Sequence, residues 1–127
     1  MKYLCMIFFD EKKLDALSTA DYDALVKASL AYDDLLRNDG HLLANQALQP
    51  VHAAKTIRPG AGKVIVTDGP FAETKEQIGG FILMAARDLN EAVELASHIP
   101  AVRLGGVEVR PIKELSGGSA GEPGKAS

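Results

Sequence analysis

The stretch TDGPFAETKEQIGGF, residues 67–81, lies between two apolar runs and decides how they connect. Asp68-Gly69-Pro70 is a strong turn signal, because glycine tolerates positive φ and proline fixes the chain direction. KVIVT (63–67) leads into the turn, and GGFILMAA (79–86) follows the polar residues after it. Both apolar runs predict strands. In this interpretation the Asp68 carboxylate accepts hydrogen bonds from nearby amides and Phe71 fills part of the core.

The residues before this stretch predict more strands. HAAKTIR (52–58) and KVIVT flank the glycine-rich turn PGAG (59–62), which is typical of a hairpin. HLLANQAL (41–48) alternates loosely and predicts a further strand. The run YLCMIFF (3–9) is continuously apolar and short, which is typical of a buried central strand.

Two helices are predicted by capping residues and apolar periodicity. The first begins at Ser18, with Asp21 three residues later, and closes at Gly40. Its apolar stripe, expected to face the core, is formed by Tyr22, Leu25, Val26, Ser29, Tyr32, Leu35 and Leu36. The second helix starts after Asp88, with Glu91 at its third position, and ends at Pro100. Residues 10–17 are expected to be a polar connection, and residues 107–115 a final strand.

This order of elements predicts an α+β sandwich of the ferredoxin-like type, with two helices on a mostly antiparallel sheet. Residues 1–115 form one domain, and the Gly/Ser-rich residues 116–127 are expected to be a disordered tail. Helices cover only one face of such a sheet, and the strands are apolar on both sides. A homodimer that packs sheet against sheet would bury the second face.

Composition excludes several classes of partner. The 127 residues carry a formal net charge of −3 and no tryptophan, which argues against direct nucleic-acid binding and anionic membranes. No apolar run has the length of a membrane span. The single cysteine, Cys5, lies in the first apolar run, where an inert buried thiol is expected. A reducing, cytoplasmic setting is the default expectation.

DGPFAETKEQIGGF, together with IPAVRLGGVEVRPI near the end of the domain, resembles the DGPF-type branch of the YCII-related proteins over residues 1–115. The resemblance implies a ferredoxin-like fold, a dimer of the α/β-barrel kind and a pocket on the sheet face near the dimer interface. One branch of the family carries a histidine and an aspartate proposed as a catalytic pair. Their places fall at Ser29 and Ile99 here, so neither catalytic group is present.

Five residues are candidates for a site. Asp68, at a strand end, and His52 are candidate general bases. Glu73 and Lys75 are candidate ligand contacts in the charged loop, and Arg103 could clamp a carboxylate. Each also has a structural interpretation: a rigid turn for Asp68, a solvated loop for Glu73 and Lys75, a surface histidine, and an ion-paired arginine. No cofactor and no metal site are expected, since no histidine pair has a recognised ligand spacing.

Two functions remain open from the sequence. The first is a small cofactor-free enzyme, such as a lyase or isomerase, or a small-molecule-binding protein with a pocket at a dimer interface. Its expected substrate is a small polar or aromatic acid, and the resemblance adds that a few relatives act on chlorinated or hydroxylated aromatic rings or on muconolactone-like compounds. The alternative is a regulatory module that binds an alternative sigma factor, which the resemblance to such partners implies.

Overall fold

The computed structural model describes residues 1–115. The expected tail, residues 116–127, lies outside the described residues. The elements, in chain order, are β1 (Lys2–Phe9), α1 (Glu11–Asp15), α2 (Thr19–Asn38), β2 (Leu42–Ala47), η1 (Val51–Ala53), β3 (Lys55–Gly60), β4 (Lys63–Asp68), β5 (Gln77–Ala85), α3 (Leu89–Ser97), η2 (Pro100–Leu104) and β6 (Gly105–Pro111). Within residues 1–115, no helix combines the length and the apolar character that a membrane crossing requires.

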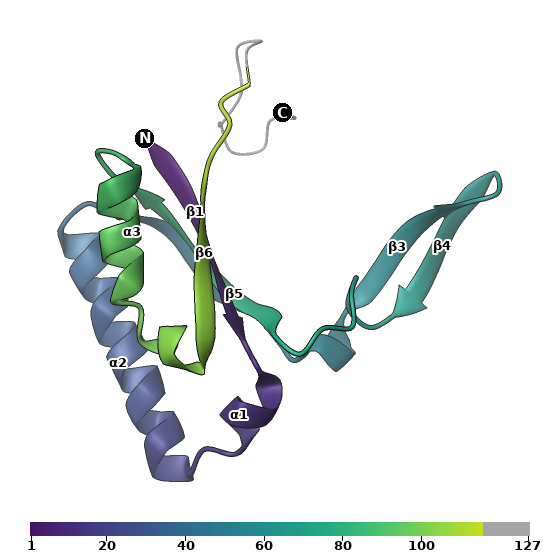
Figure 1. Cartoon of the computed structure of the whole chain (residues 1–127), viewed down its shortest axis with the longest axis horizontal. Coiled ribbons are helices and arrows are strands. Elements are labelled where there is room, and N and C mark those ends of the chain that lie inside the picture. The colour runs from purple at the N-terminus through teal and green to yellow at the C-terminus, as the bar shows by residue number, and fades with distance from the viewer. Residues whose placement is uncertain (116–127) are drawn as a thin grey trace.

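Four strands form the main sheet, in the order β2-β5-β1-β6. All three neighbouring pairs are antiparallel, and β1 lies in the centre, as its apolar run predicts. Figure 1 shows α2 and α3 together on one side of this sheet. The predicted α+β sandwich of the ferredoxin-like type, with helices on one face of a mostly antiparallel sheet, is therefore confirmed. We call the main sheet and its helices the body.

The core of the body lies between the sheet and the two long helices. Its fully buried members are Tyr3 and Cys5 on β1, Leu36 on α2, Met84 on β5 and Ala92 on α3. Because side chains alternate along a strand, the residues between these point to the other sheet face. We call that second surface, formed by Leu4, Met6, Phe8, Phe81 and Leu83, the open sheet face.

The apolar stripe of α2 is only partly buried, contrary to the expectation. Leu25 and Leu36 are buried, but Tyr22, Val26 and Leu35 are 46%, 39% and 51% exposed. Tyr22 and Val26 line a cavity instead of filling a packed core. Periodicity identifies the face of a helix correctly, but it does not show how closely the sheet packs against that face.

Local capping follows the sequence closely. The Ser18 hydroxyl accepts a hydrogen bond from the Asp21 amide at 3.0 Å, and the Asp88 carboxylate accepts one from the Glu91 amide at 2.9 Å. Gly40 takes the expected positive φ of 79° after α2. One expectation was wrong: residues 10–17 are not simply a connection. Asp10 caps the short helix α1 by accepting from the Lys12 amide at 3.0 Å.

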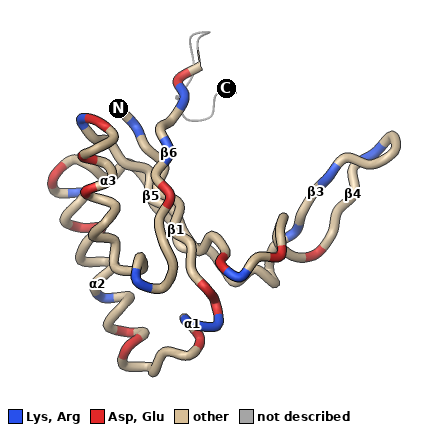
Figure 2. The backbone as a smooth tube through the Cα atoms, viewed as in Figure 1, with Lys and Arg blue, Asp and Glu red and all other residues tan. Residues whose placement is uncertain are grey.

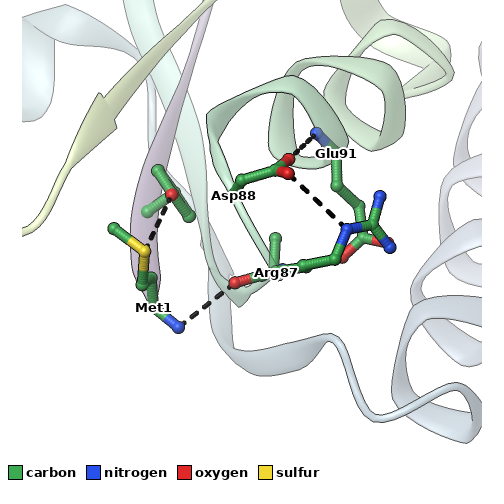
Figure 3. A network of polar contacts seen from close by, with 6 residues as sticks. Met1, Arg87, Asp88 and Glu91 are labelled. Atoms are coloured by element: carbon green, nitrogen blue, oxygen red, sulfur yellow. Dashed lines mark hydrogen bonds and ion pairs between the residues drawn. The ribbon is translucent and has the colours of Figure 1, made fainter.

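The start of β1 is tied to the start of α3. The Met1 amino group donates to the Ala86 carbonyl at 3.1 Å (Figure 3). Beside it, the Arg87 guanidinium pairs with Glu91 at 3.0 Å and with Asp88 at 3.5 Å. These contacts hold the first turn of α3 against the end of the central strands.

Strands β3 and β4 form a separate two-stranded sheet, which extends away from the body (Figure 1). We call residues 55–68 the arm. The predicted hairpin is confirmed, with Ile57 opposite Val66 and Pro59 opposite Val64. However, the first strand begins at Lys55, because residues 51–53 form a turn of 3-10 helix.

The Asp68-Gly69-Pro70-Phe71 turn closes the arm. Gly69 has φ 97°, as predicted, and its amide donates to the Ala54 carbonyl at 2.8 Å. The expectation that Phe71 fills the core was wrong, since its side chain is 69% exposed. The Arg58 guanidinium lies 3.9 Å from the centre of the Phe71 ring, so the phenyl group stacks on the arm instead.

Candidate functional site

A cavity of about 300 Å³ lies between α2 and the helix side of the sheet. We call it the inner cavity. Its walls are mostly apolar and come from β1, α1, α2, β2, β5 and the start of η2. Among the lining residues are Ile7, Phe9, Leu25, Ile82 and Ile99. The volume is at the lower end of the range for small-molecule sites. A compact ligand, such as a single substituted ring, would fill it.

Among residues 1–115, Asp33 is the only carboxylate that lines the inner cavity. Its carboxylate accepts a hydrogen bond from the Asn45 side-chain amide on β2, at 2.9 Å. Burial raises the pKa of Asp33, and this outweighs the opposing effects of the Asn45 hydrogen bond and the Arg37 charge. The result is a positioned carboxylate that binds protons more strongly than an ordinary surface aspartate.

The two positions that the resemblance assigns to a histidine–aspartate pair both line this cavity. Ser29 lies on α2, one turn before Asp33, and Ile99 lies just before η2. Ser29 supplies a hydroxyl and Ile99 an apolar side chain, so the pair itself is absent. The carboxylate of this cavity is instead that of Asp33, which lies on α2 like Ser29.

Gly79 and Gly80 shape one wall. Ile7 is paired with Gly80 and Phe8 with Ile78, so Gly79 is the extra residue of a β-bulge. A Cβ at Gly79 would lie 2.1 Å from the Phe9 ring, and one at Gly80 would lie 2.9 Å from the Gln46 carbonyl oxygen. A bulge and a close approach of neighbouring atoms are thus both present at this glycine pair, and they leave room for the Phe9 ring against β5 beside the cavity.

A second and larger hollow, which we call the outer hollow, adjoins the inner cavity. Both are lined by Phe9, Leu14, Tyr22 and Leu48, and the outer hollow adds Glu11 and His52. The Glu11 carboxylate accepts a hydrogen bond from the Val51 amide at 2.9 Å. This bond fixes α1 to η1, so the short helix forms the rim between the two spaces.

The structure does not gather the five residues selected from the sequence. His52 is exposed in η1 at the outer hollow. Asp68 ends β4 in the arm, where its carboxylate pairs with the Lys55 ammonium at 2.5 Å; both side chains are largely exposed. Arg103 is exposed in η2, and Glu73 and Lys75 are exposed in the loop before β5. Their roles in a site stay predictions.

The loop before β5 is held mainly by its own polar groups. The Gln77 side-chain amide donates to the carbonyls of Ala72, at 2.7 Å, and Thr74, at 3.2 Å. The Thr74 hydroxyl donates to the Glu76 carbonyl at 2.8 Å. The density of special residues in this stretch is therefore explained in part by the closure of the loop.

Asp33 and Asn45 were not among the candidates predicted from the sequence. The available signal was an acid on the inner side of α2, four residues after Ser29 and seven after Val26. Nothing local indicates that Asn45, on another element, reaches that acid. Within residues 1–115, no three histidine, cysteine, aspartate or glutamate side chains are grouped as metal ligands would be.

Comparison with known proteins agrees with this architecture. Residues 1–116 match the YCII-related domain. An uncharacterised protein of Rhizobium meliloti is 36% identical over 114 residues, which cover 88% of this chain and 92% of that protein. Among solved structures, 5-chloro-2-hydroxyhydroquinone dehydrochlorinase (TftG) from Burkholderia phenoliruptrix, in complex with 2,5-dihydroxybenzoquinone, has a similar fold. Its TM-score is 0.52 at 17% identity, covering 90% of this chain and 95% of that one.

The match to the domain spans the whole described region, and the β-α-β-β-α-β order of the body agrees with it. The chain therefore belongs to the YCII-related family.

Proposed function

We propose that this chain is a small enzyme or small-molecule-binding protein whose inner cavity takes one ring carrying a hydroxyl or carbonyl group. One observation carries the proposal: an apolar cavity of about 300 Å³ holds one carboxylate, Asp33, positioned by Asn45. Apolar walls with one or two fixed polar groups are typical of ligand sites. The solved neighbour binds a dihydroxylated quinone, and this supports the same ligand class here.

Asp33 would act as the general base in this proposal. Its ionised carboxylate would accept the proton of a ring hydroxyl while the Asn45 amide keeps the carboxylate in place. The resulting carboxylic acid would be the proton donor for a later step. The raised pKa of Asp33 favours this role, because proton transfer is efficient when the pKa of the base approaches the working pH.

Titration of the purified full chain with 2,5-dihydroxybenzoquinone, hydroquinone and benzoate tests the proposal. Isothermal calorimetry should detect binding of the hydroxylated rings, and Asp33→Asn should weaken it by about tenfold or more. Asp34→Asn is the matched control, because Asp34 is exposed and pairs with Arg37 on the outside of the helix. Absence of binding by every ring, or equal binding by Asp33→Asn, would refute the proposal.

The candidates outside the inner cavity are tested by the same titration. His52, at the outer hollow, would affect ligand passage, so His52→Ala should change the association rate more than the affinity. Asp68, Glu73, Lys75 and Arg103 are proposed as contacts only if a second copy of the chain brings them to a cavity. Their alanine variants should then alter binding only at concentrations where the chain is associated.

The regulatory alternative stays a prediction. A sigma-factor partner would be recovered with the tagged full chain from its host, and binding would be unaffected by Asp33→Asn. Loss of partner recovery in that variant would instead link the partner to the cavity.

A further inference from the structure

The inner cavity and the outer hollow share part of their lining. Six residues line both spaces: Phe9, Leu14, Tyr22, Ala47, Leu48 and Gly79. We call these six residues the neck. Neither space is enclosed, so a ligand can extend along the neck from one space into the other. The outer hollow measures about 880 Å³ and the inner cavity about 300 Å³, so the two together have room for more than a single ring.

The outer hollow is polar where the inner cavity is mostly apolar. It adds five polar side chains to the neck: Glu11, Asp15, Thr19, Gln49 and His52. Figure 2 shows acidic residues on α1 and on the first turns of α2, the two helices that border this hollow. The basic residues of α1, Lys12 and Lys13, line neither space. Among residues 1–115, a ligand that spans both spaces is therefore lined by carboxylates and by no lysine or arginine.

Glu11 is a fixed carboxylate without an ion pair. It is half-buried at the start of α1, and its Oε2 atom accepts the hydrogen bond from the Val51 amide at 2.9 Å. Within the described part of the chain, residues 1–115, neither Glu11 nor Asp15 takes part in a salt bridge. One hydrogen bond leaves a carboxylate with further acceptor positions. A protonated amine suits these positions best, because charge strengthens its hydrogen bonds to a carboxylate.

We infer that the ligand of this site is a hydroxylated ring that carries a short alkyl chain ending in a protonated amine. The ring lies in the inner cavity beside Asp33, the chain follows the apolar neck, and the ammonium group binds Glu11 in the outer hollow. A chain that ends in a carboxylate is disfavoured, because Glu11 and Asp15 repel it and no basic side chain among residues 1–115 lines the site to offset the repulsion. This inference rests on the function proposed for the inner cavity, and it adds the length and charge of the ligand.

The first test compares phenols that share one ring and differ in the end of the chain. Tyramine, 4-ethylphenol and 4-hydroxyphenylacetate end in an amine, a methyl group and a carboxylate, and homologues with one or two more methylene groups extend their reach. The full chain is titrated by calorimetry at low salt and about pH 8, where an alkylamine is protonated. At the chain length that binds best, the amine should bind about tenfold more tightly than the neutral phenol, and the carboxylate more weakly than either. Equal affinities, or tightest binding by the carboxylate, would overturn the inference.

This titration separates the inference from the function on which it rests. If 2,5-dihydroxybenzoquinone or hydroquinone binds but the amines bind no more tightly than the neutral phenols, the ligand class alone is wrong. If no ring binds, the proposed function fails and the inference fails with it.

Glu11→Gln tests the contact with the amine. The glutamine side chain keeps an oxygen for the Val51 amide but lacks the charge, so the amine and the neutral phenol should then bind within about twofold of each other. Asp23→Asn is the control, since Asp23 is an exposed acid of α2 that lines neither space, and the preference for the amine should persist in it. A preference that survives Glu11→Gln would overturn the inference.

A measurement on the wild type locates the ammonium group without relying on a variant that folds. The Val51 amide donates directly to Glu11, so its ¹⁵N–¹H NMR signal should move further when the amine binds than when the neutral phenol binds. A Val51 signal that moves equally with both ligands would place the amine elsewhere and overturn the inference.

Discussion

The body and the arm are both antiparallel sheets of this one chain, but they are stabilised differently. In the body, β1 and β5 bury one side chain in two against helices, with Cys5 and Met84 fully enclosed. In the arm, cross-strand partners such as Ile57 and Val66 remain more than half exposed. The body therefore contains its own core, whereas the arm depends on what lies against it.

In the body, the addition of a single methyl group at Gly105 should have a large effect on stability. A Cβ at Gly105 would lie 2.1 Å from the Phe8 carbonyl oxygen and 2.7 Å from the Phe9 Cα. Because both are backbone atoms of the central strand, Gly105→Ala should lower the free energy of unfolding by about 3 kcal/mol or prevent folding. Gly106→Ala, at a position with nothing within 4 Å, should change it by less than about 0.5 kcal/mol. Urea unfolding followed by circular dichroism compares the two.

Shortening one apolar side chain in the body and one in the arm should change the free energy of unfolding by different amounts. Leu36→Ala empties a fully buried site in the core and should cost about 2–5 kcal/mol of unfolding free energy. Val64→Ala in the arm should cost less than about 0.5 kcal/mol when the protein is dilute enough to be monomeric. Equal costs for the two variants would contradict the difference between a body that contains its own core and an arm that does not.

A smaller effect concerns Asp33. Its folded-state pKa lies above its unfolded value, so its contribution to stability is complete below the unfolded pKa and is lost as pH rises through the folded pKa. The stability of the wild type relative to Asp33→Asn should therefore fall as pH rises above the ordinary carboxyl pKa of 3.8. Urea unfolding of both proteins at several pH values measures the difference. If the stability of the wild type relative to Asp33→Asn rose with pH instead, the folded protein would favour the ionised carboxylate, and burial would not be the dominant effect on its pKa.

The smallest expected effect concerns the reactivity of Cys5, which a change in the arm should leave unaltered. Burial raises the pKa of Cys5 to about 11, from the usual 9.0, which lowers the thiolate fraction at pH 8 about 100-fold. Cys5 should therefore react with a disulfide reagent only when the body opens. Ile57→Ser should leave that rate unchanged under dilute conditions, whereas Leu36→Ala should increase it. A faster reaction in the arm variant would mean that arm and body unfold together.

Features that depend on neighbouring residues were predictable from the sequence, whereas the placement of whole elements was not. Ser18 and Asp88 cap their helices as predicted, and Gly69 takes its positive φ, because each depends on residues within a few positions. The direction of the arm was not predictable, since the hairpin pattern is the same whether its strands join the main sheet or leave it. The exposure of Phe71 follows from that direction.

The candidate site was predicted less well for the same reason. The inner cavity depends on how far α2 stands from the sheet, and Asp33 becomes positioned only through Asn45 on another element. Sequence analysis selected residues with unusual neighbours along the chain, such as Asp68 and Lys75. These neighbours turned out to close a turn and a loop.

The bulge at Gly79 lies where the chain returns from the arm to the body. Gly79 lines the inner cavity, its carbonyl accepts a hydrogen bond from the Leu48 amide at 2.9 Å, and it lies in the strand that leads back from the arm. A ligand beside Gly79 would thus act on the short piece of backbone through which the arm returns to the body.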